Sequence, residues 1–253
     1  MTSPLLLLID ADFYFYRAAT SGEYEMEYSE DLTVIAGDFN KGKSMVKYEF
    51  KQLCERFDTD NILLTFTAPD NFRKDVDPDY KGNRTKRKPC GYLKLKNWGL
   101  ETYPSIQYPR LEADDVMGIL ATNGSLDNFV LISPDKDMAQ IPCRIYDLKT
   151  EYTQTPGAAK RLLYKQTLTG DSTDGYKGCP GIGPKRADQI LDKVKNEDYW
   201  PAVVGAYEEV ELTEADALRN FYLARILQVG DYDTVNQVPL FPHEIESKGT
   251  PVG

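Results

Sequence analysis

Short apolar runs alternate with longer amphipathic stretches through the N-terminal part of the chain. Leu5–Ala11, Asn61–Ala68 and Phe129–Ser133 are almost continuously apolar, and Arg144–Leu148 is a fourth, weaker run. Runs of this length without alternation are typical of strands that are buried on both faces, as in a parallel sheet. We therefore expect three buried strands and a candidate fourth.

Helical periodicity appears in the intervals between these runs. In Gly42–Phe57 the apolar side chains of Val46, Phe50 and Leu53 recur every three or four residues, and Leu111–Ala121 has a similar spacing. Strands that alternate with helices predict an α/β core, with a mainly parallel central sheet flanked by helices.

Strand signals fade after residue 155. Four segments with helical character follow, namely Ala158–Leu168, Lys185–Lys195, Tyr199–Glu208 and Glu214–Gln228. We expect an α/β core over residues 1–154 and a helical region over residues 155–253. No clean linker separates them, so they should form one compact unit, with the polar tail from Asp231 lying over the surface.

The formal net charge of −10 argues by itself against a nucleic-acid partner, because such partners usually select basic proteins. The charges are segregated, however. The interval from Tyr80 to Trp98 contains no acidic residue and seven basic ones: Lys81, Arg84, Lys86, Arg87, Lys88, Lys94 and Lys96. This interval belongs to a basic arch segment at about residues 69–98, which is suited to an anionic polymer.

The basic arch segment is long for a structureless connection, so it is either functional or mobile. Its aromatic residues Tyr80, Tyr92 and Trp98 favour contact with a single strand or flap through charge and base stacking. Because dense like charge opposes ordering, we expect part of Arg73–Lys96 to be mobile without DNA. The alternative is a solvated loop. The expected DNA contacts are Lys86, Arg87 and Lys88.

Four scattered cysteines without a CxxC pair and a single histidine, His243, argue against a zinc site. Reduced thiols in a cytosolic protein are the simplest interpretation. No segment approaches the roughly 20 apolar residues of a membrane span, and the run Leu5–Ile9 is too short for a signal peptide. We therefore expect a cytoplasmic protein without a membrane partner.

Acidic residues gather in four motifs. Ligands of open α/β sheets bind beyond the carboxyl ends of the strands, where Asp10 and Asp135 are expected. Asp135 and Asp137 are two residues apart, so an extended backbone points both the same way. Glu112 and Asp115 are three apart and share one helix face. The motifs are Asp10-Ala-Asp12, Glu112-Ala-Asp114-Asp115, Asp135-Lys-Asp137, and Asp171 with Asp174 in a glycine-rich turn.

So many carboxylates in one place are electrostatically costly unless cations lie among them. Oxygen-only ligands suit Mg²⁺, with Mn²⁺ as a substitute. Two such ions about 4 Å apart can activate a water and stabilise the leaving oxygen of a phosphodiester. Asp114 can join directly only if its helix begins near it. Each motif alone is weak, because such acids also cap helices or form turns, but the four together favour a metal cluster.

The sequence GCPGIGPK, followed by helical spacing, is the sharpest signal in the chain. Gly181 and Gly183 permit a tight turn with close backbone approach. The next helix would present its amide ends, Lys185 and Arg186 to a phosphate. This is the pattern of a helix–hairpin–helix at residues 178–191, which binds the DNA backbone without sequence preference. The alternative is a plain loop between two helices.

These motifs together resemble the flap endonuclease / 5′-nuclease family, particularly the compact bacteriophage 5′→3′ exonucleases. LLIDADFYFYRAA is similar to the family's opening strand and FRKDVDPDYKGNR to its arch-entry motif. LEADDVMGILA, ISPDKDMAQI and LTGDSTDGYKGCPGIGPKRADQIL match its acidic motifs and hairpin. The resemblance implies a metal-dependent nuclease acting on duplex or branched DNA with a 5′ end, nick or flap. RNA primers in RNA–DNA hybrids would be further substrates.

The resemblance also implies roles for single residues. One metal ion would lie among Asp10, Glu112, Asp114 and Asp135. A second would lie among Asp115, Asp137, Asp171 and Asp174. The basic residues that would contact the scissile phosphate or the 5′ region are Arg73, Lys81 and Arg84. The hairpin contacts to DNA would come from Gly181, Gly183, Lys185 and Arg186, and hairpin carbonyl groups would bind a monovalent cation such as K⁺.

One position departs from the family pattern, in which an Asp directly follows the second strand. Here Phe66 is followed by Thr67, and the nearest acid is Asp70. Whether Asp70 or Asp12 joins the site stays open. Two rival functions also stay open. The hairpin and the basic arch segment argue against a PIN-like ribonuclease, and the complete acidic set argues against a catalytically silent, structure-specific DNA-binding module. We expect a stand-alone monomer, with a single-stranded-DNA-binding protein or the replication machinery as possible partners.

Overall fold

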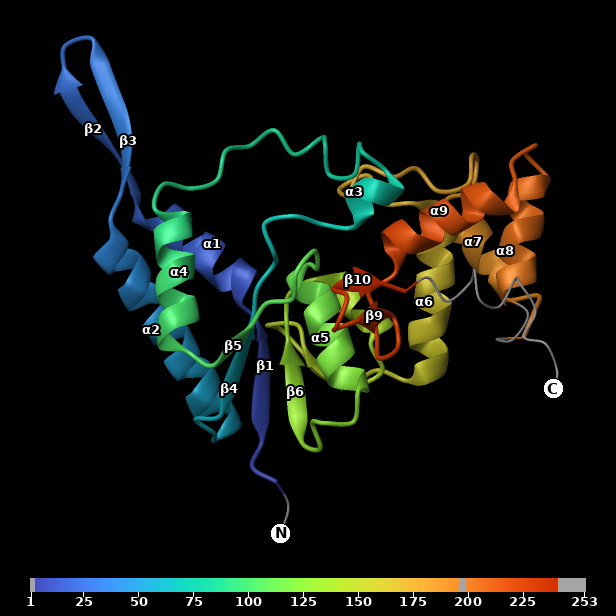
Figure 1. The fold of residues 1–253 in the computed structure, drawn as a ribbon, viewed down its shortest axis with the longest axis horizontal. Coiled ribbons are helices and arrows are strands. Elements are labelled where there is room, and N and C mark those ends of the chain that lie inside the picture. Colours follow the sequence, from blue (N-terminus) through green and yellow to red (C-terminus); the bar gives the residue numbers. More distant parts are fainter. Residues whose placement is uncertain (1–2, 196–198, 241–253) are drawn as a thin grey trace.

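The computed structural model describes residues 3–195 and 199–240 (Figure 1). Its centre is a six-stranded sheet in the order β5-β4-β1-β6-β7-β8. Neighbouring strands are parallel except β7 and β8. The expected mainly parallel sheet is therefore confirmed. The strands are β1 (Leu6–Asp10), β4 (Ile62–Thr65), β5 (Ser105–Ile106), β6 (Phe129–Ile132), β7 (Arg144–Tyr146) and β8 (Glu151–Thr153).

Alternate side chains of the central strands enter two different apolar clusters. Leu7 and Ile9 pack in a cluster with helices on one face of the sheet, whereas Leu8 packs with a helix on the other. Figure 1 shows these helices on the two sides of the sheet. The first face is covered by α1 (Ala11–Gly22), α2 (Phe39–Phe57) and α4 (Tyr92–Thr102), and the second by α5 (Ala113–Thr122). Burial on both faces explains the continuous apolar runs.

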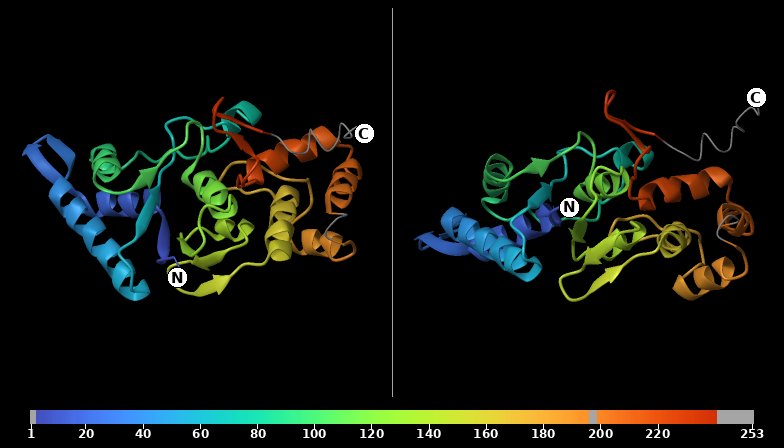
Figure 2. Two further views of the ribbon diagram at one scale, coloured as in Figure 1. Left: turned by 60° about the horizontal axis from the view of Figure 1, so that its bottom comes forward. Right: turned by 90° about the horizontal axis from the view of Figure 1, so that it is seen from below.

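The C-terminal helices form a third apolar cluster beside the sheet (Figure 2). They are α6 (Pro156–Thr169), α7 (Pro184–Leu191), α8 (Tyr199–Glu208) and α9 (Glu214–Ala224). Thr155 caps α6 and Thr213 caps α9 through their side chains, so both begin at good N-cap residues. The four expected helices are confirmed, although α7 and α9 end earlier than expected. The boundary at residues 154 and 155 stays a prediction.

Helices also occupy both ends of the basic arch segment. Helix α3 (Arg73–Val76) lies at its start and α4 at its end, so the irregular part is confined to residues 77–91. Tyr80 within that part is only 2% exposed and joins the apolar cluster of the C-terminal helices. The segment therefore has an apolar anchor near its middle that its charge pattern did not predict, while its mobility stays a prediction.

A two-stranded hairpin, β2 (Glu23–Ser29) with β3 (Leu32–Gly37), projects from one end of the molecule (Figure 1). Most of its side chains are exposed, and Tyr28 is 75% exposed. Residues 23–37 include five acidic residues and no basic one. The alternation of glutamates with Tyr24, Met26 and Tyr28 has the two-residue period of a strand, so the sequence could have predicted this element.

The tail after α9 is anchored rather than simply laid over the surface. Asp231 is buried and accepts a hydrogen bond from Arg225 Nε at 2.8 Å. The Tyr232 ring stacks on Tyr108 with centroids 5.7 Å apart, and β9 (Tyr232–Asp233) pairs with β10 (Val238–Pro239). The remaining tail, including His243, lies outside the described residues. In the described part of the chain, no helix is long and apolar enough to cross a membrane.

A buried ion pair joins three separate parts of the chain. Arg73 at the start of α3 is 3% exposed, and Asp115 in the first turn of α5 is fully buried. Their two nitrogen–oxygen contacts are both 2.7 Å. Arg73 also donates to the carbonyl oxygens of Leu223 and Arg225, and Asp115 accepts from the Leu227 N–H. The pair thus connects α3, α5 and the segment that follows α9.

Gly118 is required where α5 packs on that same segment. A Cβ at Gly118 would lie 2.2 Å from the Leu227 carbonyl oxygen, which is backbone and cannot easily move. Gly118→Ala should therefore lower the free energy of unfolding by about 1–3 kcal/mol in urea denaturation. Gly205 of α8 is the matched control, because a Cβ there would meet nothing within 4 Å. Gly205→Ala should raise stability by about 0.5–1 kcal/mol. Equal stability of the two variants would contradict the close approach.

Removal of Asp115 should expose the cost of burying an unpaired cation. Asp115→Ala should lower the free energy of unfolding by about 3–5 kcal/mol, because the Arg73 guanidinium would stay buried without its partner. The double variant Arg73→Met/Asp115→Leu should be more stable than Asp115→Ala, since it buries no charge at this place. If Asp115→Ala unfolded like the wild type, the pair would not carry the role described here.

Candidate functional site

The carboxyl ends of β1 and β6 bring two acidic motifs to one edge of the sheet. Asp10 ends β1, caps α1, and accepts a hydrogen bond from Ser133 Oγ at 2.9 Å. Asp135 follows β6 and caps the short 3₁₀ helix η1 (Lys136–Gln140), where its side chain accepts from the Asp137 N–H at 2.8 Å. This is the arrangement expected from strand ends in an open α/β sheet.

Asp10, Asp114 and Asp135 lie close enough to repel one another. Burial, then the charges of Asp12 and Asp135, raise the pKa of Asp10 to about 7. Burial, then the charges of Asp10 and Asp135, raise the pKa of Asp114 well above its usual value. Helix α5 begins at Ala113, so Asp114 lies in its first turn. This meets the condition under which Asp114 can join the other acids directly. At both acids, burial and like charge therefore outweigh the groups that favour ionisation.

Glu112 has the opposite environment. Lys81 Nζ and Arg73 Nη1 form ion pairs with its carboxylate, and the Tyr80 hydroxyl donates to it at 3.0 Å. Burial alone would raise the pKa of Glu112, but the Lys81 and Arg73 cations outweigh it and lower the pKa to about 2. Glu112 is thus an ionised carboxylate whose charge the protein itself neutralises.

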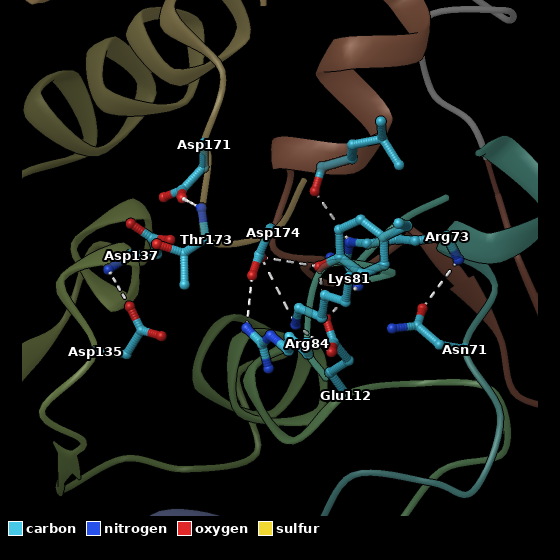
Figure 3. A network of polar contacts seen from close by, with 12 residues as sticks. Asn71, Arg73, Lys81, Arg84, Glu112, Asp135, Asp137, Asp171, Thr173 and Asp174 are labelled. Carbon is cyan, nitrogen blue, oxygen red and sulfur yellow. Dashed lines mark hydrogen bonds and ion pairs between the residues drawn. The ribbon is translucent and has the colours of Figure 1, made fainter. Parts of the chain in front are cut away.

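Asp137, Asp171 and Asp174 form a second acidic group, which lies beside Asp135 and Glu112 (Figure 3). Burial, then the charge of Asp135, raise the pKa of Asp137 to about 6, although Gln166 donates to its carboxylate at 2.6 Å. Asp171 accepts from Lys136 at 3.2 Å. Asp174 accepts from the Tyr80 hydroxyl at 3.0 Å and from Arg84 at 2.7 Å, and Lys81 Nζ lies 3.6 Å away.

Two glycines shape the loop that carries Asp171 and Asp174. Gly170 and Gly178 have φ of 67° and 65°, in the left-handed region that favours glycine. A Cβ at Gly178 would also lie 2.3 Å from the Gly170 backbone nitrogen. The loop therefore closes on itself at its base, which fixes both carboxylates against the edge of the sheet.

Two cavities meet at these acids. The larger, of about 1120 Å³, runs between α1, α4 and the edge of the sheet. The smaller, of about 110 Å³, lies between the two acidic groups. Both are lined by Lys81, Arg84, Glu112, Asp114 and Asp135. The first also reaches Asp10 and Asp12, and the second reaches Asp137, Asp171 and Asp174.

Seven of the eight acids predicted to bind metal thus surround the two cavities. Asp115, the eighth, lines neither cavity in the described part of the chain, because both of its oxygens pair with Arg73. Among the described residues, no three acidic, cysteine or histidine side chains are arranged to hold a metal ion as they stand. The metal-ligand assignments therefore stay predictions.

The three predicted catalytic cations have different surroundings. All five donors of Arg73 are taken: two by Asp115, one by Glu112 and two by carbonyl oxygens. That burial favours a positioning role over direct contact with a phosphate. Lys81 and Arg84 line both cavities instead, and Arg84 is 53% exposed. These two remain able to exchange a carboxylate for a phosphate.

The rings of Tyr80 and Tyr92 are 2% and 6% exposed, so neither presents the free face that base stacking needs. The hydroxyl of Tyr80 instead lies 3.0 Å from a carboxylate oxygen of Glu112 and 3.0 Å from one of Asp174. No pattern along the chain predicted these contacts. Asp70 is exposed and lies near Arg110 instead of lining either cavity described here. The geometry therefore does not support Asp70 as a residue of the site.

The predicted hairpin joins α6 to α7 through an exposed turn. Gly181 has φ of 73°, whereas Gly183 is extended and caps α7. Lys185 and Arg186 are exposed in the first turn of α7, and Ile182 is buried beneath them. On the basic arch segment, Lys86, Arg87 and Lys88 are exposed as well, and Arg87 pairs with Glu23. All of these cations can reach an outside ligand, and their DNA contacts stay predictions.

Comparison with known proteins places this geometry in a family. The family described as "5′-3′ exonuclease, N-terminal resolvase-like domain" matches residues 5–162. The exonuclease of Escherichia phage T7 is 29% identical, over 92% of this chain and 91% of its own length. The exodeoxyribonuclease of Enterobacteria phage T3 is also 29% identical, over 92% of this chain and 90% of its own.

A solved structure of the bacteriophage T5 flap endonuclease, in a complex with DNA and metal ions, shares the fold. Its TM-score is 0.63 at 19% identity, over 87% of this chain and 88% of that one. The α/β core, the acids at its sheet edge and the match over residues 5–162 agree. The chain therefore belongs to the 5′-3′ exonuclease family.

Proposed function

We propose that this chain is a 5′-3′ exonuclease and flap endonuclease that hydrolyses phosphodiester bonds of DNA. The observation that carries the proposal is the position of Asp114 and Asp135 where the two cavities meet, with Asp10 beside them in the larger cavity. Burial and neighbouring carboxylates raise the pKa of Asp10 and of Asp114, an arrangement that is typical of sites that bind cations. The related phage enzymes carry the names exonuclease and exodeoxyribonuclease, which supports the same activity here.

The chemistry of the donors fits divalent metal ions. The acids around the cavities offer only carboxylate oxygens, which Mg²⁺ and Mn²⁺ prefer, and one solved relative was crystallised with metal ions. Asp10, Asp114 and Asp135, with Glu112 beside them, would hold one ion. Asp137, Asp171 and Asp174 would hold a second. Such ions supply an activated water and stabilise a developing negative charge on oxygen.

The cations of the chain would act on the phosphate. Lys81 Nζ lies between Glu112 and Asp174, and Arg84 pairs with Asp174 at the mouth of the smaller cavity. When an incoming phosphate competes for these two side chains, they can bind its oxygens and neutralise the charge that develops during cleavage. Arg73 would keep Glu112 and α5 in place from behind, without touching DNA.

Duplex DNA would be held at a distance from the acids. The exposed start of α7 offers free N–H groups with Lys185 and Arg186, a combination that binds backbone phosphates irrespective of sequence. Binding of K⁺ by the hairpin carbonyl groups and cleavage of RNA paired with DNA are finer expectations that come from the resemblance. Flap, nicked duplex and RNA–DNA hybrid substrates would separate these activities from those of a PIN-like ribonuclease.

Replacement of one acid that lines the larger cavity should stop cleavage. Asp135→Asn or Asp10→Asn should reduce Mg²⁺-dependent cleavage of a 5′-flap substrate by a factor of about 10³ or more. DNA affinity should stay the same or increase, because charge repulsion falls. Asp70→Asn is the matched control, since Asp70 lies outside both cavities. Near wild-type turnover of Asp135→Asn would remove this acid from the site.

Replacement of the cations at the start of α7 should affect binding instead of chemistry. Lys185→Ala/Arg186→Ala should weaken duplex binding and reduce the log–log salt slope by about one to two units. The cleavage rate at saturating DNA should change little. Lys51→Ala/Lys149→Ala, which removes two exposed lysines elsewhere, is the charge-matched control. A salt slope that equals that of the control would exclude the hairpin from the DNA-binding surface.

A further inference from the structure

Asp12 borders the larger cavity but is already engaged by three groups of the protein. Its Oδ2 accepts from the Thr67 N–H at 2.8 Å. Its Oδ1 accepts from the Tyr92 hydroxyl at 2.8 Å, and Lys96 Nζ lies 3.5 Å away. Thr67 lies just after β4, and the other two partners belong to α4. Asp12 thus links the first turn of α1 to a neighbouring strand end and to α4.

Helix α4 forms one wall of the larger cavity, opposite α1. The α4 residues that line it are Tyr92, Leu93, Lys96, Asn97 and Leu100, and the α1 side includes Phe13, Tyr16 and Arg17. At the far end of α4 the two helices touch at Gly99, where a Cβ would lie 2.3 Å from the Phe15 ring. Asp12 provides the polar contact near the start of α4, close to the acids.

Lys96 is the cationic partner of Asp12. Its amino group donates to the Thr67 carbonyl oxygen at 2.5 Å while it faces Asp12. Burial lowers the pKa of Lys96, and the charge of Asp12 opposes that shift. Lys96 thus connects α4 to Asp12 and to the strand end at Thr67 at the same time.

We infer that Asp12 is a positioning residue that holds α4 at a fixed distance from α1 through Tyr92 and Lys96. It thereby sets the width of the larger cavity and the position of the basic arch segment that leads into α4. The inference rests on the proposed function and deepens it, since it assigns the fit of the DNA strand in this cavity to a contact between the two helices that form its walls.

The test uses variants that remove the partners and leave the carboxylate. Tyr92→Phe deletes one hydroxyl, Lys96→Met deletes one cation, and the double variant deletes both. In the double variant, hydrogen exchange of the α4 amides should become about tenfold faster, and KM for a 5′-flap substrate should rise about tenfold. The single-turnover rate at saturating DNA should stay within about threefold of the wild type. Tyr48→Phe, at an exposed tyrosine of α2, is the control and should change neither quantity.

Variants of Asp12 itself separate positioning from metal binding. Asp12→Ala should reproduce the double variant, with an unchanged Mg²⁺ concentration for half-maximal rate. Asp12→Asn should raise KM less than Asp12→Ala does, because the amide oxygen of Asn can still accept a hydrogen bond from the Tyr92 hydroxyl. A Mg²⁺ requirement that rises for Asp12→Ala alone would overturn the inference in favour of a metal ligand, as would wild-type α4 exchange in the double variant. If the proposed function were wrong, the wild-type chain itself would show no Mg²⁺-dependent cleavage. Hydrogen exchange of the α4 amides would still decide the role of Asp12.

Discussion

The buried pair of Arg73 and Asp115 is the constraint on which the rest of the site depends. It fixes α3, the start of α5 and the segment after α9 against one another, although these parts are far apart in the sequence. Because the start of α5 carries Glu112 and Asp114, the pair also fixes two acids of the site. A buried ion pair of this kind adds little net stability over apolar residues, but it strongly penalises any arrangement that separates the partners.

The sign of the net charge conceals how the chain balances its charges. A negative protein binds a negative polymer only when its cations are placed where the polymer arrives, and here Lys81 and Arg84 lie among the acids themselves. The pairing with Glu112 and Asp174 keeps both cations in place, and it also keeps the acids from repelling one another. In the proposed function, divalent ions would compete with these protein cations for the same carboxylates.

Much of the fold could be predicted because strand burial leaves a plain signature. The continuous runs at β1, β4 and β6, and the strand-end positions of Asp10 and Asp135, followed from one-dimensional pattern alone. The role of Asp115 could not, because its pairing with Arg73 depends on packing across 42 positions of the chain. Tyr80 was misread for the same reason: an aromatic residue in a basic segment looks exposed until its apolar neighbours from the C-terminal helices are known.

The projecting hairpin of β2 and β3 has a consequence for how copies of this chain meet. Among residues 3–195 and 199–240, each of its strands pairs in a sheet only with the other. Each strand therefore keeps one edge that a further strand can add to. Tyr24, Met26 and Tyr28 would favour such stacking. The five acidic side chains, with no cation among them, oppose it, because any second hairpin brings the same charge to the same edge. The hairpin therefore has the exposed edges and side chains that favour association, but its negative charge opposes pairing with the same hairpin of a second copy.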